Sequence, residues 1–355
     1  MSVKRVSELL CVYPNTALLT DSQSKCVKQN TGLGQQCDYN RELIWTCVNM
    51  GNTATRIKGY RLSTRLGGGC FGVVYKMKSK TDAKVYALKE IYRGKSPNGL
   101  ASLHREVDIH EQLPYHRNIV RFIECFKQEF KLYIVLEFCS LGTLNDYIIT
   151  NDVSDKTLLY IMFDTARGLQ HIHRHNIVHR DIKPDNVLLS AGKFGIPTCK
   201  ICDFGLARYC DKGGVVGQQC DDDPPASDDG PMMYMAPEIT SGLYTVACDV
   251  FSLGMLYFVM YSLHVTEFKG RKVLEPHAHG YPMFTAPDSV VETEIERYVR
   301  GQLNRDLIIA MLRKKPSDRC TITDVLERLY AIFAGAISTD KDASTTWRVS
   351  NGHIE

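Results

Sequence analysis

The order in which strand-like and helix-like segments follow each other most constrains how this chain can fold. Residues 60–91 contain three short segments rich in β-branched and aromatic residues, separated by GGGCFG and KTDA. A stretch with helical spacing, LASLHREVDIHEQL, and two more strand-like segments, IVRFIECFK and LYIVLEFC, come next. From Thr143 to about Ala334 the spacing is mostly helical, interrupted by strand-like NVLLS and CKICD. Such an order is typical of α+β proteins. We therefore predict a small antiparallel β-rich lobe with one helix (59–138), a hinge near Glu137–Ser140 and a larger, mainly helical lobe (139–334).

The segments outside these two lobes carry little structural signal. Residues 1–58 are polar without a sustained period, and only residues 43–50 resemble a strand, so we predict an extension of unknown role. Residues 335–355 form a polar tail. The longest uncharged stretch, residues 250–266, is shorter than the about 20 apolar residues that span a bilayer, and we expect a buried helix there. Glu8 and Pro14 interrupt any signal-peptide core.

Charge and cysteine content narrow the possible partners and compartment. The 43 basic and 40 acidic side chains leave a formal net charge of +3, too little for nucleic-acid binding by bulk charge. The 13 cysteines are an odd number spread along the chain, unlike the dense pattern of a secreted disulfide scaffold. Cys199 and Cys202 form a single CxxC without the second pair that zinc sites use. We expect reduced thiols in an intracellular protein, cytoplasmic or nuclear, without a membrane span or a nucleic-acid partner.

A glycine-rich turn lies between the first two predicted strands. Gly67, Gly69 and Gly72 fit the pattern GxGxxG, which lets backbone amides approach phosphate oxygens. Dinucleotide-binding folds share this spacing but open a helix after it, whereas VVYKMKS is strand-like. The pattern therefore favours a flap over phosphates, with an ordinary hairpin turn as the alternative.

A lysine on the third predicted strand could neutralise those phosphates. Lys89 ends the segment VYALK, and an isolated lysine at such a position is more often simply solvated. Glu106, on the following predicted helix, could pair with Lys89 and fix its position. Glu111 lies on the same helix and is a less favoured partner.

The segment IVHRDIKPDNVLLS contains residue types that phosphoryl transfer requires. Transfer to a hydroxyl needs a carboxylate to accept its proton, a cation for developing charge and oxygen ligands for magnesium. Asp181, Lys183 and Asn186 supply these on one short loop, and Asp203 of CKICDFGLAR adds a carboxylate at a strand end. A charged loop of ion pairs would be the alternative, but the order of the glycine turn, Lys89, Glu106 and these motifs argues against coincidence.

This ordered set of motifs resembles the eukaryotic-type protein kinase family over about residues 60–333. The resemblance implies a two-lobed kinase fold that binds ATP and Mg²⁺ and acts on a protein substrate. It implies Asp181 as the catalytic base, Lys183 as the γ-phosphate contact, and Asn186 and Asp203 as magnesium ligands. The residues that it implies around ATP are Leu66, Gly67, Gly68, Gly69, Cys70, Phe71, Gly72, Val74, Ala87, Lys89, Glu106, Glu137, Cys139, Leu188 and Asp203. Of these, Val74, Ala87 and Leu188 would sandwich the purine, and Glu137–Cys139 would hold its edge through backbone groups, beside Leu136 at the gatekeeper position.

The resemblance also implies structural partners and includes departures. Glu238 of YMAPE matches a glutamate that pairs with an arginine, here Arg319, and Asp249 matches an aspartate that braces the catalytic loop. Phe251 replaces a usual tryptophan, which we interpret as a packing change. His110 stands where an aliphatic residue is more common, and we expect a core histidine, with a weak pH sensor as the alternative.

Two features disagree about the acceptor. Lys183 and Pro184 resemble the serine/threonine type, whereas Pro231 before Tyr234 resembles the tyrosine type. We predict serine/threonine specificity because Lys183 acts on the transferring phosphate. Dual-specificity or tyrosine kinases, and a pseudokinase scaffold, are the alternatives. The retained Lys89, Asp181 and Asp203 argue against a scaffold.

The segment between residues 209 and 229 suggests how activity could be regulated. It contains six aspartates against one lysine, and Ser227 lies beside two of them. Our hypothesis is that this acidic run, or phosphorylated Ser227, supplies an anion for Arg180. A solvated acidic loop is the alternative.

Overall fold

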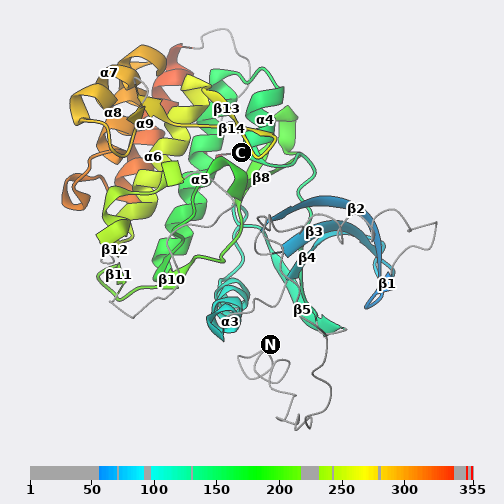
Figure 1. Cartoon of the computed structure of the whole chain (residues 1–355). Helices are drawn as coiled ribbons and strands as arrows, with labels where there is room; N and C mark the ends of the chain where they lie inside the picture. The colour runs from blue at the N-terminus through cyan, green and yellow to red at the C-terminus, as the bar shows by residue number, and fades with distance from the viewer. Residues whose placement is uncertain are drawn as a thin grey trace, which may run out of the picture.

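A β-sheet and a helical region make up the two parts of the chain, joined after Glu137 (Figure 1). The computed structural model describes residues 56–69, 72–91, 97–128, 131–216, 232–241, 244–278, 281–339, 349–350 and 353–354. The predicted α+β fold, with an antiparallel β-rich N-lobe and a helical C-lobe, is confirmed. The possible strand at residues 43–50 and nearly all of the predicted extension lie outside the described residues.

The N-lobe sheet has six antiparallel strands in the order β1-β2-β3-β4-β6-β5. Its strands are β1 (Arg56–Ile57), β2 (Tyr60–Gly69), β3 (Gly72–Ser79), β4 (Val85–Ile91), β5 (Phe122–Gln128) and β6 (Lys131–Glu137). The glycine-rich segment joins β2 to β3, where Gly69 pairs with Gly72. Gly72 has a φ of +142°, and a Cβ there would lie 1.9 Å from the carbonyl oxygen of Glu90. Only glycine fits at this position, because a side chain would collide with the backbone of β4.

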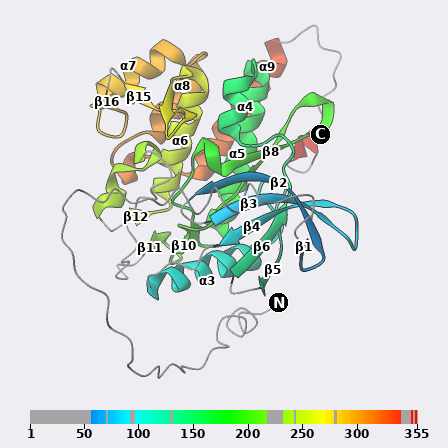
Figure 2. The same ribbon diagram turned by 45° about the vertical axis from the view of Figure 1, so that its right-hand side comes forward.

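Alternation along β4 gives the two sheet faces different partners. Leu88 points to one face, where it packs with Met77 and Val135. Ile91 belongs to the other face, where it packs with Val107 of helix α3 (Pro97–Gln112). Figure 2 shows α3 running along the sheet. Lys89 shares the face of Ile91, so the strand directs this lysine toward α3.

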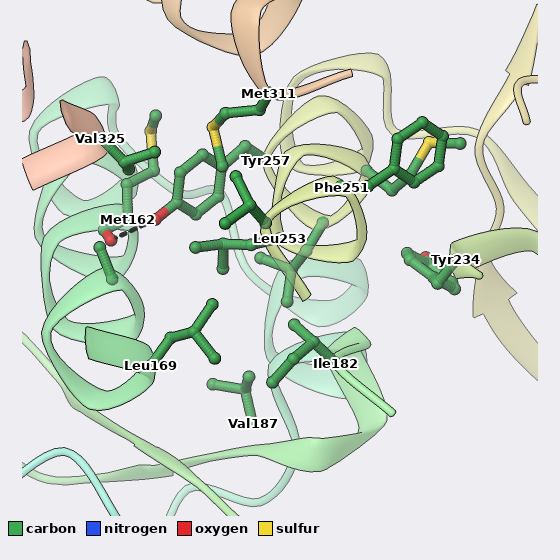
Figure 3. Packing of buried hydrophobic residues seen from close by; sticks show 14 of the residues in the cluster. Met162, Leu169, Ile182, Val187, Tyr234, Phe251, Leu253, Tyr257, Met311 and Val325 are labelled. Carbon is green, nitrogen blue, oxygen red and sulfur yellow. Dashed lines mark hydrogen bonds between the residues drawn. The ribbon is translucent and has the colours of Figure 1, made fainter. Parts of the chain in front are cut away.

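The helical lobe is built around two long buried helices. They are α5 (Asp155–Arg174) and α6 (Ala247–Ser262). Ser154 caps α5 by accepting a hydrogen bond from the backbone N–H of Thr157 at 3.2 Å. The Tyr257 hydroxyl of α6 donates to the carbonyl oxygen of Met162 on α5 at 2.5 Å, which satisfies its polar atom inside the core (Figure 3). The remaining helices are α4 (Leu144–Thr150), α7 (Asp288–Tyr298), α8 (Gln302–Met311) and α9 (Ile322–Thr339).

Short elements complete the described part of the C-lobe. Its paired strands are β7 (Ile177–Val178) with β10 (Arg208–Tyr209), β8 (Val187–Ser190) with β9 (Thr198–Ile201), β11 (Val215–Val216) with β12 (Tyr244–Thr245), β13 (Val265–Phe268) with β14 (Arg271–Leu274), and β15 (His277–Ala278) with β16 (Tyr281–Pro282). In the predicted polar tail, β17 (Val349–Ser350) pairs with β18 (His353–Ile354). The single-turn 3₁₀ helices are η1 (Pro184–Asn186), η2 (Lys193–Gly195), η3 (Met232–Tyr234), η4 (Pro237–Ser241) and η5 (Pro316–Asp318).

A buried helix was predicted at residues 250–266. Its burial is confirmed, but the helix ends earlier than predicted. Helix α6 is buried along almost its whole length but ends at Ser262. Leu263 follows with a φ of +51°, and the chain then enters the hairpin β13–β14. No helix within the described residues is both long and apolar enough to cross a membrane.

Candidate active site

Lys89 makes the central contact between the two lobes at the site. Its Nζ lies 2.6 Å from Oε1 of Glu106 on α3 and 3.1 Å from Oδ1 of Asp203. Burial alone would lower the pKa of Lys89, but the carboxylates of Asp203 and Glu106 raise it above its ordinary value. The lysine is therefore held as a cation at the base of the glycine-rich strand pair.

The catalytic-loop residues are packed against one another. Lys183 Nζ lies 2.9 Å from Oδ1 of Asp181. Asn186 Nδ2 donates to the Asp181 carbonyl oxygen at 2.8 Å and to its Oδ2 at 2.7 Å. Burial lowers the pKa of Lys183 while the Asp181 carboxylate raises it, with a net rise. Asp181 thus has a fixed orientation beside a permanent positive charge.

The carboxylate of Asp249 on α6 accepts hydrogen bonds from the backbone just before Asp181. Its Oδ2 accepts from the backbone N–H of His179 at 2.8 Å, and its Oδ1 accepts from that of Arg180 at 2.7 Å. His173 Nε2 lies 2.9 Å from Oδ2. Arg180 has a φ of +68°, a conformation that non-glycine residues rarely adopt. The fully buried Asp249 supplies the hydrogen bonds that keep this turn in place, as the family resemblance implies.

The hairpin β8–β9 brings the two implied magnesium ligands together. Val187 pairs with Ile201, and the N–H of Cys202 donates to the carbonyl oxygen of Asn186 at 2.9 Å. Asn186 and Asp203 therefore lie at the same end of the hairpin, although 17 positions separate them. The turn of this hairpin includes η2.

The polar atoms of these two side chains suit a hard cation. The Asn186 amide nitrogen is engaged by Asp181, which leaves its Oδ1 to act as a ligand. Asp203 Oδ1 accepts from Lys89 and from the N–H of Gly205 at 3.2 Å, so Oδ2 is the oxygen that would bind a metal. Burial would raise the pKa of Asp203, but Lys89 lowers it below its usual range, and the group stays ionised. Two oxygen ligands plus phosphates are a common arrangement for Mg²⁺. The described residues contain no group of three or more His, Cys, Asp and Glu arranged for a metal.

The strands also place the residues implied around the purine. Ala87 of β4 lies opposite Leu136 of β6, and Val74 of β3 lies opposite Lys89. Leu188 of β8 pairs with Lys200 of β9 in the C-lobe and Cys139 is buried at the hinge, whereas Leu66 is exposed. Gly67 and Gly68 pair with residues of β3, and Cys70 and Phe71 lie outside the described residues.

Glu137 at the hinge is held by contacts to Arg121 and Lys200. Its N–H donates to the carbonyl oxygen of Arg121 at 3.0 Å, so this donor is already engaged within the N-lobe. Its carboxylate lies 3.1 Å from Nζ of Lys200 on β9 and accepts from the N–H of Arg121 at 3.1 Å. Sequence reasoning missed Lys200, a buried lysine of CKICD whose charge in a strand centre was the available signal. The Glu137 side chain ties the hinge to the C-lobe.

His110 is a core residue on α3. It is 6% exposed, its Nε2 lies 2.7 Å from the carbonyl oxygen of Val120, and its ring is 4.7 Å from that of Phe204. Burial lowers the pKa of His110 to about 4, so the imidazole is neutral at physiological pH. This favours the core-histidine interpretation over a sensor near neutral pH.

The activation segment, which the family resemblance implies to end at Glu238 of YMAPE, is fixed there by a buried ion pair. Arg319 contacts Glu238 through both terminal guanidinium nitrogens, Nη1 and Nη2, with Nη2 2.7 Å from Oε2. The Arg319 Cζ lies 4.8 Å from the ring centre of Phe251, so the residue that replaces tryptophan still packs under this arginine. Residues 217–231, which include five of the six aspartates of the acidic run, Ser227 and Pro231, lie outside the described residues. Arg180 Nη1 lies 3.4 Å from the carbonyl oxygen of Leu206.

Comparison with known proteins agrees with this geometry. A family model described as the protein kinase domain matches residues 60–331. The chain belongs to the protein kinase family. The predicted family membership is therefore confirmed.

The kinase resembles curated relatives with different described specificities. It is 33% identical over 195 residues to a membrane-associated tyrosine- and threonine-specific cdc2-inhibitory kinase of Drosophila melanogaster, covering 54% of this chain and 34% of the relative. It is 29% identical over 284 residues to serine/threonine-protein kinase ATG1a of Arabidopsis thaliana, covering 78% and 42%. It is 32% identical over 202 residues to cyclin-dependent kinase-like 4 of Mus musculus, covering 56% and 55%. The matched regions thus span about a third to a half of these relatives.

Proposed function

We propose that this kinase transfers the γ-phosphate of ATP to serine and threonine hydroxyls of protein substrates. The contact that carries the proposal is the 2.9 Å approach of Lys183 to Asp181, because a base and a cation are needed side by side at the acceptor. The described serine/threonine specificity of the Arabidopsis relative agrees with it.

Each residue has a defined part in this reaction. Asp181 accepts the proton of the acceptor hydroxyl as its oxygen attacks the γ-phosphorus. The bond from that phosphorus to the β–γ bridging oxygen breaks, and ADP leaves. Lys183 stabilises charge on the transferring phosphoryl group, and Lys89, held by Glu106, binds phosphates further along the nucleotide. Mg²⁺ held by Asn186 and Asp203 would neutralise phosphate charge.

Loss of Asp181 tests the reaction directly. The Asp181→Asn variant keeps the shape of the residue and a carbonyl oxygen for the Asn186 amide, but it cannot take up the proton. With radiolabelled ATP and casein or myelin basic protein, we expect incorporation to fall at least about 100-fold relative to wild type. Equal incorporation by both proteins would indicate a contaminant and favour the scaffold interpretation.

A second candidate is dual specificity, as described for the Drosophila relative. Phosphoamino-acid analysis of the labelled substrate separates the two. Phosphoserine and phosphothreonine alone support the first candidate, phosphotyrosine beside phosphothreonine supports the second, and phosphotyrosine alone contradicts the first.

We also propose that the kinase domain, expected at residues 59–334, acts in the cytoplasm or nucleus. Its sheet begins with β1 (Arg56–Ile57), and its last helix, α9, ends at Thr339. Seven cysteines of the described part of the chain are free thiols, which supports a reducing compartment.

A further inference from the structure

The hairpin β13–β14 lies beside the site of phosphate transfer and has no role so far. It forms through a two-residue turn in which Lys269 and Gly270 have φ values of +49° and +75°. Both positive values match the tight turn that follows the twist of paired strands. Figure 1 shows the hairpin next to α4.

Three elements around the acceptor position hold this hairpin. The buried Asn145 of α4 donates from Nδ2 to the carbonyl oxygen of Lys272 at 3.0 Å, and its Oδ1 accepts from the N–H of Leu274 at 2.8 Å. The Tyr234 hydroxyl of η3 donates to the carbonyl oxygen of Leu274 at 2.7 Å. The hairpin is therefore fixed to α4 and to the end of the activation segment.

The third attachment is electrostatic and involves the catalytic loop. Arg271 Nη1 lies 2.7 Å from Oδ1 of Asp185, and Nη2 lies 2.9 Å from Oδ1 of Asp146 on α4. Asp185 lies between Lys183 and Asn186 in sequence, so its carboxylate borders the position that an acceptor must reach. Its side chain is 30% exposed, whereas those of Arg271 and Asp146 are about half exposed.

Without Arg271, two carboxylates would face the approach of a protein substrate. An arginine or lysine close to the acceptor residue would then gain a charge-assisted contact. Arg271 already supplies that cation from within the chain.

We propose that Arg271 occupies the position that a basic substrate residue would otherwise take, so that this kinase does not select acceptors flanked by arginine or lysine. The proposal rests on the protein kinase activity proposed above. It makes the hairpin an element of substrate selection.

An arginine-scanned peptide series tests the proposal. Each peptide carries one serine acceptor in a neutral sequence, with arginine placed at one flanking position at a time. Wild type should show values of kcat/KM within about twofold across the series. Arg271→Gln should gain about tenfold for arginine in at least one position, which is the effect of one charge-assisted hydrogen bond.

Two further variants separate this effect from general changes of charge. Lys272→Gln removes the same charge from the neighbouring residue, which points to the opposite side of the strand and is exposed. It should behave as wild type. Adding Asp185→Asn to Arg271→Gln should abolish most of the gain, because the released carboxylate is then neutral.

A peptide-binding measurement tests the preference for arginine without requiring phosphate transfer. Fluorescently labelled arginine peptides and their alanine counterparts are titrated into each variant with a non-hydrolysable ATP analogue, and only Arg271→Gln should prefer arginine. Absence of phosphate on every peptide would count against the proposed activity, whereas the binding preference would still be measured.

If Arg271→Gln does not melt cooperatively, Arg271→Met, which keeps the aliphatic stem, replaces it. Unchanged selectivity in folded variants overturns the proposal and leaves the hairpin a purely structural element.

Discussion

Lys89 shows how one side chain can serve both stability and chemistry. It is 7% exposed and contacts two carboxylates, Glu106 and Asp203, from different lobes. Removing only the lysine leaves two negative groups near each other in a region of low solvent access. A buried charge that has lost its partner is far more costly than a missing pair.

We therefore predict different effects for single and double substitutions at this pair. Lys89→Met should lower the free energy of unfolding by about 3 kcal/mol, because Glu106 is left buried without its cation. Adding Glu106→Leu should recover most of that loss, since an apolar pair can replace a buried ion pair. Neither variant should transfer phosphate. Urea unfolding and a radiolabelled ATP assay measure the two properties, and a Lys89→Met variant as stable as wild type would contradict the argument.

At single positions, sequence patterns predicted which residues share a site but not the backbone conformation of each residue. The motif order predicted that Lys89, Glu106 and Asp203 share a site, since the residue types are specific to phosphate chemistry. The positive φ values of Arg180 and Asp203 were not predictable, because no glycine marks them. They depend on hydrogen bonds to Asp249 and Gly205 that form only in the folded chain. The roles of the nucleotide-contacting residues stay predictions.

Arg319 joins separate elements of the C-lobe. Its side chain is fully buried, pairs with Glu238 of η4 and donates to the carbonyl oxygens of Lys314 at 2.8 Å and Ala247 at 3.2 Å. It therefore links the activation-segment end, the loop before α9 and the start of α6. Lysine lacks the planar set of donors that these partners require.

Arg319→Lys should lower the free energy of unfolding by about 3 kcal/mol despite keeping the charge, because several buried acceptors lose their donors. Arg313→Lys is the matched control, since Arg313 forms a half-exposed ion pair with Glu292 at 2.7 Å. The control should change stability by less than about 1 kcal/mol. Chemical denaturation compares the two, and equal losses would show that burial of the guanidinium is not the cause.

The hairpin β13–β14 marks where element prediction from sequence failed. The helical period of α6 continues into apolar residues after Ser262, so no clear signal marks the end of the helix. Lys269–Gly270 is a weaker turn signal than Asn-Gly or Asp-Gly. The strands are stabilised by Asn145 and Tyr234, which come from distant parts of the chain. Long-range contacts of this kind have no local sequence signature, whereas the long periodic α5 and the alternating N-lobe strands do.

Five described histidines from both lobes have a pKa that burial lowers, so they are neutral near pH 7. Burial lowers the pKa of His110 and of His116 to about 4, and it also lowers the pKa of His104, His171 and His179. An unfolded chain exposes all of these groups, and each then titrates near its ordinary pKa of 6.5. Below that pH the unfolded state binds more protons than the folded state. Acid therefore shifts the equilibrium of the entire fold toward unfolding.

His110 allows this linkage to be measured at one group. Its stabilising effect is complete above pH 6.5 and is lost as the pH falls from 6.5 toward 4, because only the unfolded state is protonated in that window. Between pH 7.5 and pH 5 the loss amounts to about 2 kcal/mol, at 1.36 kcal/mol per pH unit. His110→Met should shrink the measured fall in unfolding free energy by that amount. The comparison at pH 7.5, where the histidine is neutral in both states, measures the combined cost of the lost hydrogen bond to Val120 and of the changed packing against Phe204. Parallel pH profiles for the two proteins would show that His110 does not titrate differently on folding, and the acid sensitivity would then rest with the remaining groups.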